Sequence, residues 1–237
     1  MSTNMSTKVP IRHLEKIRKL ERKKHHAFVH HIHKKHNISK RTLFYVKEYG
    51  PHSNVPRTII KESIKVLVFA SIISSFGGLA IEQIKTLFVS IIPLIVLLPT
   101  LNDMIGDYGS IVSSKFSTML HENQARGNLW ANKKLRVLFA QVIFISTFTA
   151  LLSAAIALII SNFSGYAVIP SIALKVFLIA LIDVVVLVTL LFFTSVIAGR
   201  YFFKKQEDPN NFLIPISTSI ADFGNMLVLA VLVVVFF

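Results

Sequence analysis

The last hydrophobic stretch of the sequence carries three oxygen-bearing side chains at helical spacing. Thr218, Asp222 and Asn225 lie four and three residues apart, so an α-helix would place them on one face. A carboxylate at bilayer depth costs on the order of a few kcal/mol, so it needs an ion pathway, a partner or a proton. Asp222 is therefore a candidate cation ligand. A polar stripe that only hydrogen-bonds a neighbouring helix is the alternative interpretation.

A second polar cluster lies at the end of an earlier hydrophobic stretch. It consists of Pro99, Thr100, Asn102, Asp103, Gly106, Asp107 and Gly109. Glycine and proline favour irregular backbone, which membranes tolerate where it lines a water-filled cavity. Carboxylate and carbonyl oxygens are the ligands that hard cations such as Mg²⁺ and Ca²⁺ prefer. The same residue types also form helix-capping turns at the cytoplasmic surface, so both interpretations stay open.

A third acid, Asp183, falls in the middle of another hydrophobic stretch. It could join a cation pathway, relay protons or pair with a neighbouring helix, and its sequence neighbours do not separate these roles.

These residues must be positioned by membrane-spanning helices. About 20 mostly apolar residues cross a bilayer as a helix, and five segments qualify, at about 63–81, 86–101, 137–160, 172–198 and 212–237. The first contains serines and a Gly77-Gly78 pair, which favour close packing against other helices over lipid contact. Pro93 and Pro99 predict that the second is kinked or broken. The runs are continuously apolar, which excludes barrel strands, so we expect an all-α polytopic membrane protein.

The distribution of charge predicts the topology. The net charge of +14 is concentrated in residues 1–65, which hold 16 of the 26 Lys and Arg but 4 of the 12 acids. With the N-terminus inside, the cytoplasmic parts (1–65, 103–136 and 200–211) contain 24 basic residues, and the external connections contain Lys85 and Lys175. Positive residues concentrate on the cytoplasmic side, so we predict a cell-membrane protein with a cytoplasmic N-terminus and an external C-terminus. A secretory signal is not expected, because the head has no compact apolar region.

Two motifs carry a family resemblance. The first runs from Pro99-Thr-Leu-Asn102-Asp-Met-Ile-Gly106-Asp107 through Ser113-Ser-Lys115-Phe-Ser117-Thr118-Met-Leu-His121. It resembles the second-helix signature of MgtE and solute-carrier-41-type magnesium transporters, approximately P-x-x-N-G-x-x-G-N. The second motif is similar to the last helix of that family, and it comprises Asp208-Pro209-Asn210, Pro215, Thr218 and Ala221-Asp222.

The resemblance implies a divalent cation pore formed by a homodimer, most simply for Mg²⁺ uptake. By that comparison Asp222 would coordinate a largely hydrated ion, and Thr218 and Asn102 would line its path. Asp107 stands where the family usually has Asn, and Asp103 replaces a Gly. These departures add up to four negative charges per dimer near the inner mouth, which favour divalent cations. Asp107 therefore joins Asp222, Asn102 and Thr218 as an expected metal ligand, while Asp103, Asn225 and Asp183 are expected along the cation pathway.

The sequence divides into a basic, histidine-rich cytoplasmic segment at 1–58 and a five-helix transport domain at 59–237. The head is interpreted as an arm on anionic lipid head groups. A regulatory metal or pH sensor is the alternative, because His26, His30 and His33 would share a helical face. Nucleic-acid binding is not expected, since the head is tethered to a membrane domain and has no recognised reading module.

Composition and motifs disfavour an enzyme. There is no Cys, no phosphate-binding Gly-rich motif and no nucleophile–base constellation, so we expect no cofactor, and Mg²⁺ only as the transported ion. Two alternatives stay open. One is a non-transporting membrane protein whose basic head docks lipid or a partner, and the other is a transporter of Mn²⁺, Co²⁺ or Ca²⁺.

Overall fold

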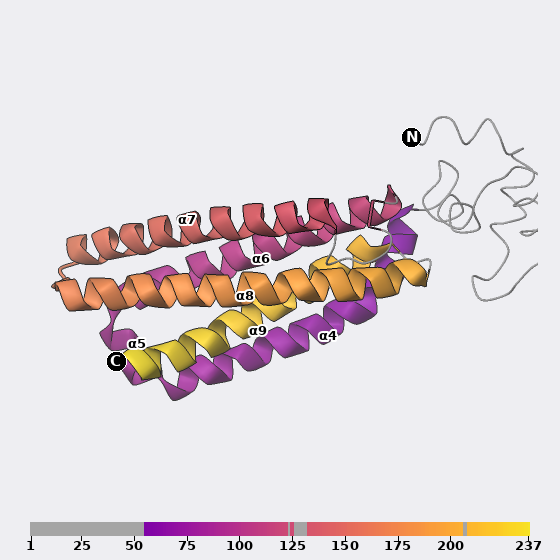
Figure 1. Cartoon of the computed structure of the whole chain (residues 1–237). Helices are drawn as coiled ribbons and strands as arrows, with labels where there is room; N and C mark the ends of the chain where they lie inside the picture. Colours follow the sequence, from indigo (N-terminus) through magenta and orange to yellow (C-terminus); the bar gives the residue numbers. More distant parts are fainter. Residues whose placement is uncertain (1–54, 123, 126–131, 206–207) are drawn as a thin grey trace, which may run out of the picture.

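The computed structural model describes residues 55–122, 124–125, 132–205 and 208–237. These ranges form six α-helices and no strand, which confirms the all-α class for this part of the chain. With the labels of Figure 1, they are α4 (Val55–Gln83), α5 (Lys85–Ser90), α6 (Ile92–His121), α7 (Lys133–Phe163), α8 (Pro170–Lys204) and α9 (Pro209–Phe236). The histidine-rich head lies outside the described residues, and the domain boundary at 58 stays a prediction.

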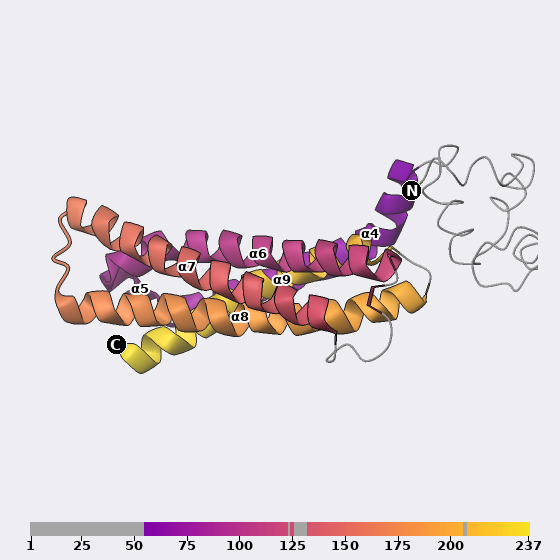
Figure 2. The same cartoon turned by 45° about the horizontal axis from the view of Figure 1, so that its top comes forward.

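The five long helices run side by side in one bundle (Figures 1 and 2). Short α5, the turn between α7 and α8, and the C-terminus lie at one end of the bundle, which we call the α5 end. The start of α4 and the connections from α6 to α7 and from α8 to α9 lie at the opposite end. The described helices therefore start and finish at opposite ends of the bundle.

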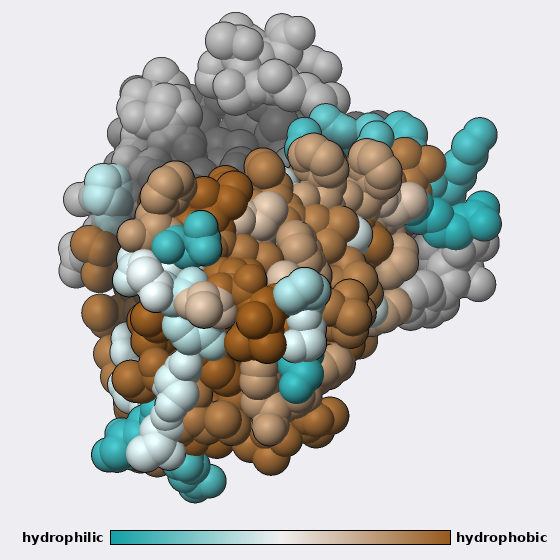
Figure 3. All heavy atoms as spheres, turned by 90° about the vertical axis from the view of Figure 1, so that its left-hand side faces the viewer, coloured by the Kyte–Doolittle hydropathy of each residue, from teal (hydrophilic) through white to brown (hydrophobic). Residues whose placement is uncertain are grey.

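Four helices are long and apolar enough to cross a membrane. The qualifying segments are Ser63–Gln83, Lys133–Phe163, Pro170–Lys204 and Pro209–Phe236. They match the first, third, fourth and fifth predicted spans. Figure 3 looks onto the α5 end of the bundle and shows a mostly hydrophobic surface with scattered hydrophilic groups.

The predicted second span, 86–101, is wrong in its bounds. Helix α5 ends at Ser90, the backbone breaks at Ile91, and α6 continues from Ile92 to His121. Pro93 lies in the first turn of α6, where a missing N–H costs little. Pro99 lies inside the helix without ending it. Helix α6 is not among the four segments that qualify by length and apolarity.

The expected backbone of the second polar cluster is also wrong. Residues 99–109 form continuous helix, so neither the irregular segment nor the capping turn is present. The connection between α6 and α7 is shorter than the predicted range 103–136, because α6 extends to His121 and α7 begins at Lys133. Helix α6 is held in place by buried apolar residues between and beyond the two acids, since Ile105, Val112 and Phe116 are fully buried.

Polar side chains define where two of the helices begin. The Asn132 side chain accepts hydrogen bonds from the backbone N–H groups of Lys134 (3.0 Å) and Leu135 (3.3 Å) at the start of α7. Asp208 accepts from the N–H of Asn210 at 3.0 Å, directly before Pro209 at the start of α9. Capping oxygens and a first-turn proline are typical helix starts, so the Asp208-Pro209-Asn210 motif fixes the entry into the last helix.

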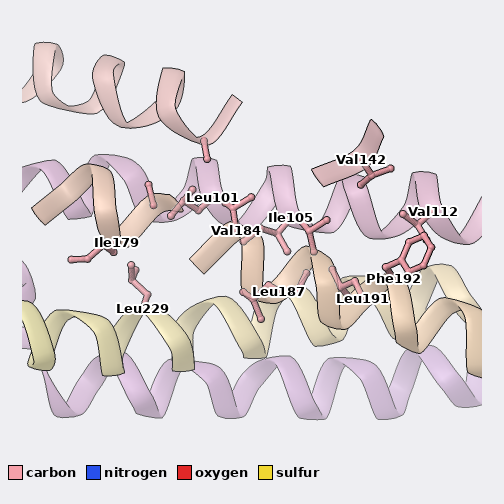
Figure 4. Close-up of a cluster of buried hydrophobic side chains, with 14 of the residues drawn as sticks. Leu101, Ile105, Val112, Val142, Ile179, Val184, Leu187, Leu191, Phe192 and Leu229 are labelled. Carbon is pink, nitrogen blue, oxygen red and sulfur yellow. The ribbon is translucent and has the colours of Figure 1, made fainter. Parts of the chain in front are cut away.

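The core lies where α6, α8 and α9 meet, with α7 covering α6 and α8. Figure 4 shows Leu101 and Ile105 of α6 together with Val184 and Leu187 of α8 and Leu229 of α9 in this layer. These five side chains are almost completely buried. Close packing of this kind fixes the relative register of the helices. It therefore also fixes the positions of their polar residues along the bundle axis.

Three serines join the same helices through their hydroxyl groups. Ser113 Oγ of α6 lies 3.0 Å from Ser195 Oγ of α8 and 2.9 Å from Ser217 Oγ of α9. All three residues are buried. Small hydroxyl residues allow helices to approach closely and still satisfy one another's hydrogen bonds inside a membrane bundle.

Candidate cation-binding site

The carboxylate of Asp222 is the centre of a hydrogen-bond network between three helices. Asn102 Nδ2 of α6 donates to Asp222 Oδ1 at 2.7 Å. Ser74 Oγ of α4 donates to Asp222 Oδ2 at 3.1 Å. Each carboxylate oxygen therefore has one neutral donor, and each still has lone pairs for a further donor or a cation.

A relay of amides orients Asn102. Asn225 Nδ2, one turn further along α9 from Asp222, donates to Asn102 Oδ1 at 3.1 Å. The Asn102 amide therefore accepts from one α9 residue and donates to another, which fixes which of its atoms faces Asp222. In this arrangement Asn102 positions the carboxylate and presents its N–H, not its oxygen, to the site. Asn225 Oδ1 is buried and has no hydrogen-bond partner among the described residues.

Thr218 lies on the same face of α9 but uses its hydroxyl locally. Thr218 Oγ1 donates to the backbone carbonyls of Ile214 and Pro215, both at 3.1 Å. These carbonyls lie in the turn around Pro215, the proline inside α9. The hydroxyl hydrogen is therefore committed to the helix, and only oxygen lone pairs remain to face a cation.

Helix α4 approaches α9 closely at Asp222. A Cβ placed at Gly77 would lie 3.2 Å from Phe223 Cα, 3.4 Å from Asp222 O and 3.0 Å from Met226 Sδ. The absent side chain at Gly77 therefore allows the close approach that brings Ser74 to the carboxylate. Two further serine bonds tie these helices, from Ser63 Oγ to Asn211 O (3.1 Å) and from Ser219 Oγ to Ala70 O (3.0 Å).

The rest of α4 is not covered by the described chain. The expectation that this span packs against other helices is correct for its small-residue face. Its large apolar residues are exposed, and Ile60, Phe69 and Phe76 are 62%, 64% and 56% accessible. Ser74 itself was not among the expected site residues, although the run of serines and glycines around it signalled close packing.

Asp103 and Asp107 lie on a different face of α6 from Asn102. Both are exposed, as is Thr100 on the same side of the helix. Partly exposed Ser110 and Ser114 continue this face at helical spacing. We call Thr100, Asp103, Asp107, Ser110 and Ser114 the acidic face of α6. The described chain leaves this face uncovered.

Asp183 is not joined to this network. The residue is completely buried in α8, and neither carboxylate oxygen has a hydrogen-bond partner among the described residues. The described residues also contain no group of three or more His, Cys, Asp or Glu side chains placed to hold a metal ion. The described chain thus provides one carboxylate with neutral donors at Asp222, not a preformed metal cage.

Comparison with known proteins supports a transport role. Residues 98–232, more than half of the chain, match the family model of MgtE, described as a divalent cation transporter. No curated protein and no solved structure matches the chain. The matched region contains Asn102, Asp183 and Asp222, while α4 with Ser74 precedes it. Together with the four apolar helices, the match indicates a multi-pass membrane protein. The chain belongs to the MgtE family of divalent cation transporters, which are transport proteins and not enzymes.

Proposed function

We propose that the chain forms a homodimeric pore for Mg²⁺ uptake in which Asp222 is the principal cation ligand. The observation that carries this proposal is the Asp222 carboxylate, held by Asn102 at 2.7 Å and by Ser74 at 3.1 Å inside the helix bundle. Both donors are uncharged, so they orient the carboxylate and leave its negative charge uncompensated. An oriented carboxylate with free lone pairs is suited to attract a hard cation.

Helix α6 is proposed as the fifth membrane crossing. It lies alongside the four apolar helices in the bundle (Figures 1 and 2), and its apolar residues Leu101, Ile105 and Val112 are fully buried. Its acidic face cannot be exposed to lipid without a large energetic cost. A water-filled pathway would solvate this face, and the neighbouring Asn102 would connect it to Asp222.

A second copy of the chain would complete that pathway. Two acidic faces opposite each other would enclose water and present Asp103 and Asp107 from each subunit. The second copy would supply the oxygen ligands that the Asp222 site lacks among the described residues of a single chain. Mg²⁺ requires near-octahedral geometry and loses water reluctantly, so a few carboxylates around a hydrated ion suit it better than a dry cage.

The direction of movement follows from the predicted topology, with the α5 end outside and the opposite end in the cytoplasm. An inside-negative potential favours inward movement by about 2.3 kcal/mol per elementary charge per 100 mV, and by twice that for a divalent ion. Uptake by this route requires no ATP. Thr218 and Asn225 would lie along the same path, and their oxygens would contact the hydration shell of the ion.

Flux measurements test the assigned function and site. Purified protein in liposomes should pass Mg²⁺, and competition with Ca²⁺, Mn²⁺ and Co²⁺ should rank Mg²⁺ first. Asp222→Asn should abolish the flux, because it removes the charge and keeps the shape. Glu122→Gln, at an exposed residue just after α6, is the matched control and should transport normally. Absent flux in the wild-type protein would refute the function, and normal flux in Asp222→Asn would refute the site.

Cross-linking tests the dimer independently of transport. The chain has no Cys, so a single introduced cysteine reports on one position. Ser110→Cys, on the acidic face of α6, should be joined to its counterpart in a second copy by a bifunctional thiol reagent, because the two faces are separated by the water-filled path. Phe163→Cys, at the exposed end of α7, is the control and should not. Cross-linking only at the control position would rule out the proposed arrangement.

A further inference from the structure

Asp183 is a buried acid that the proposed cation site does not use. It lies in the middle of α8, on the face that also carries Ile179, Ala180 and Leu187, and its exposure is 0%. These neighbouring side chains are apolar and are also buried. The carboxyl group is therefore enclosed by the bundle.

Asp183 and Asp222 differ in their hydrogen-bond partners. Each oxygen of Asp222 accepts a hydrogen bond from another helix. Neither oxygen of Asp183 has a hydrogen-bond partner among the described residues. A structural role as a bond between helices would require such a partner, so Asp183 contributes nothing of this kind to the packing.

An ionised carboxylate in this position would also lack a counter-charge. Helix α7 has no charged residue between Val137 and Phe163. On α6, Asp103 and Asp107 lie on the exposed acidic face, and on α9 the carboxylate of Asp222 is bonded toward α6 and α4. All three are acids, so they would disfavour a further negative charge.

The cations of α8 itself are distant. Lys175 is eight residues from Asp183, about 12 Å along the helix, and its Nζ lies over the Phe237 ring, 4.5 Å from the centroid. Arg200 lies more than four turns away in the other direction. A metal ion would need several oxygens around it, and the described residues provide no cluster of three acids or histidines. A proton is the counter-charge that fits this site.

The register of α8 and α9 places Asp183 near the proposed cation path. Leu187, one turn along α8 from Asp183, packs against Gly224, where its Cδ2 would lie 2.8 Å from an added Cβ. The next residue, Asn225, begins the relay through Asn102 to Asp222. A rearrangement that admits water and a divalent cation along this relay would therefore loosen the contact next to Asp183.

We propose that Asp183 is a proton-binding site, occupied in the present arrangement of the helices, and that it releases its proton when the divalent cation passes. We call this arrangement closed, because the carboxyl group of Asp183 is fully buried in it. The carboxylic acid loses H⁺ to water on the external side of the opened bundle and regains H⁺ from the cytoplasmic side on closure. Protonated and ionised forms therefore alternate within the transport cycle, and each cycle moves one proton outward as the divalent cation moves inward. This inference rests on the proposed transport function for the release step. Proton occupancy in the closed state does not depend on it.

Infrared spectroscopy tests the occupancy. The purified wild-type protein should show the C=O stretching band of a protonated carboxyl group in an apolar site, with a shift in D₂O. Asp183→Asn should lose this band, and Asp222→Asn should retain it. A wild-type spectrum without the band, or a band that persists in Asp183→Asn, would overturn the proposal. Absence of the band from the wild-type spectrum overturns the proposal even where Asp183→Asn does not fold.

Paired ion measurements test the release. In liposomes that report both internal Mg²⁺ and pH, wild-type protein should couple Mg²⁺ entry to proton movement. Asp183→Asn should pass Mg²⁺ with the proton signal lost. Mg²⁺ entry without proton movement in the wild type would refute the coupling and leave the transport function intact. Absent Mg²⁺ entry in the wild type would instead refute the transport function, and with it the release step.

Discussion

Asn102 Nδ2 lies 2.7 Å from Asp222 Oδ1, so a neutral amide on α6 orients a carboxylate on α9. The same amide accepts from Asn225 at 3.1 Å. The three side chains are joined by consecutive hydrogen bonds from Asn225 to Asn102 and from Asn102 to Asp222. The position of the Asp222 carboxylate therefore depends on Asn225 as well as on Asn102.

Substitution of Asn102 should disturb the site through its geometry. Asn102→Ala removes the donor to Asp222 and the acceptor for Asn225, and a hydrogen bond to a charged group is worth about 1.5–3 kcal/mol. We expect Mg²⁺ flux to fall roughly tenfold or more, since about 1.4 kcal/mol corresponds to a factor of ten. Asn162→Ala, at an exposed position near the end of α7, should leave the flux unchanged. Equal flux in Asn102→Ala and the wild type would show that orientation by Asn102 does not matter.

Two adjacent serines of α4 offer a matched comparison. Ser74 donates to Asp222 Oδ2, whereas Ser75 donates to the Ser71 carbonyl of its own helix. Ser74→Ala should reduce Mg²⁺ flux several-fold, because one of the two donors that hold the carboxylate is lost. Ser75→Ala should have no effect in the same liposome assay. Indistinguishable rates for the two variants would remove α4 from the site.

Replacing two adjacent glycines of α4 by alanine should have different effects on the stability of the protein. A Cβ at Gly77 would lie 3.2 Å from the Phe223 backbone, while a Cβ at Gly78 meets nothing within 4 Å. We expect Gly77→Ala to destabilise the α4–α9 contact by about 1–3 kcal/mol through overpacking. Gly78→Ala should be neutral or stabilise by up to about 1 kcal/mol, because alanine favours the helix. Thermal unfolding in detergent measures both, and a stabilised Gly77→Ala would contradict the close approach.

The acidic face of α6 should control cation attraction more than ion coordination. Asp103→Asn with Asp107→Asn removes two exposed negative charges per subunit and leaves the Asn102–Asp222 bond in place. We expect a higher Mg²⁺ concentration for half-maximal flux, with the rate at saturating Mg²⁺ largely retained. The difference from wild type should shrink at high salt, which screens exposed charges. A lost saturating rate would instead place these acids in direct contact with the ion.

Much of the candidate site could be predicted because it depends on helical periodicity. The spacing of Thr218, Asp222 and Asn225 predicted one polar face, and the structure joins Asp222 and Asn225 through Asn102. The role of Thr218 could not be predicted. Its hydroxyl can donate a hydrogen bond either to its own helix or to a neighbouring helix, and which of the two forms depends on the backbone geometry near Pro215. Ser74 could not be identified either, since its partner lies 148 residues away in the sequence.

The length of α6 could not be predicted from the local composition of the sequence. Asp103 and Asp107 lowered the apolar character of this segment, and the sequence prediction ended the span at residue 101. Apolar residues recur at helical spacing between and beyond these acids, at Ile105, Val112 and Phe116, and all three are fully buried. This periodicity, rather than the local charges, indicates that the helix continues beyond residue 101. Pro93 and Pro99 predicted a kinked or broken span. The backbone breaks at Ile91, just before Pro93, whereas Pro99 lies within continuous helix, because a proline inside a well-packed helix need not end it.

The described chain enters the bundle at Val55 and leaves it at the opposite end, at Phe237. In the proposed dimer, two such chains insert in the same direction, so the symmetry axis that relates them runs along the membrane normal. Each side chain facing that axis then meets its own counterpart at the same depth, and one substitution alters both walls of the passage. A mixed dimer with one wild-type and one Asp222→Asn subunit would keep half of the charge at that depth, which separates the contribution of a single carboxylate from that of the pair.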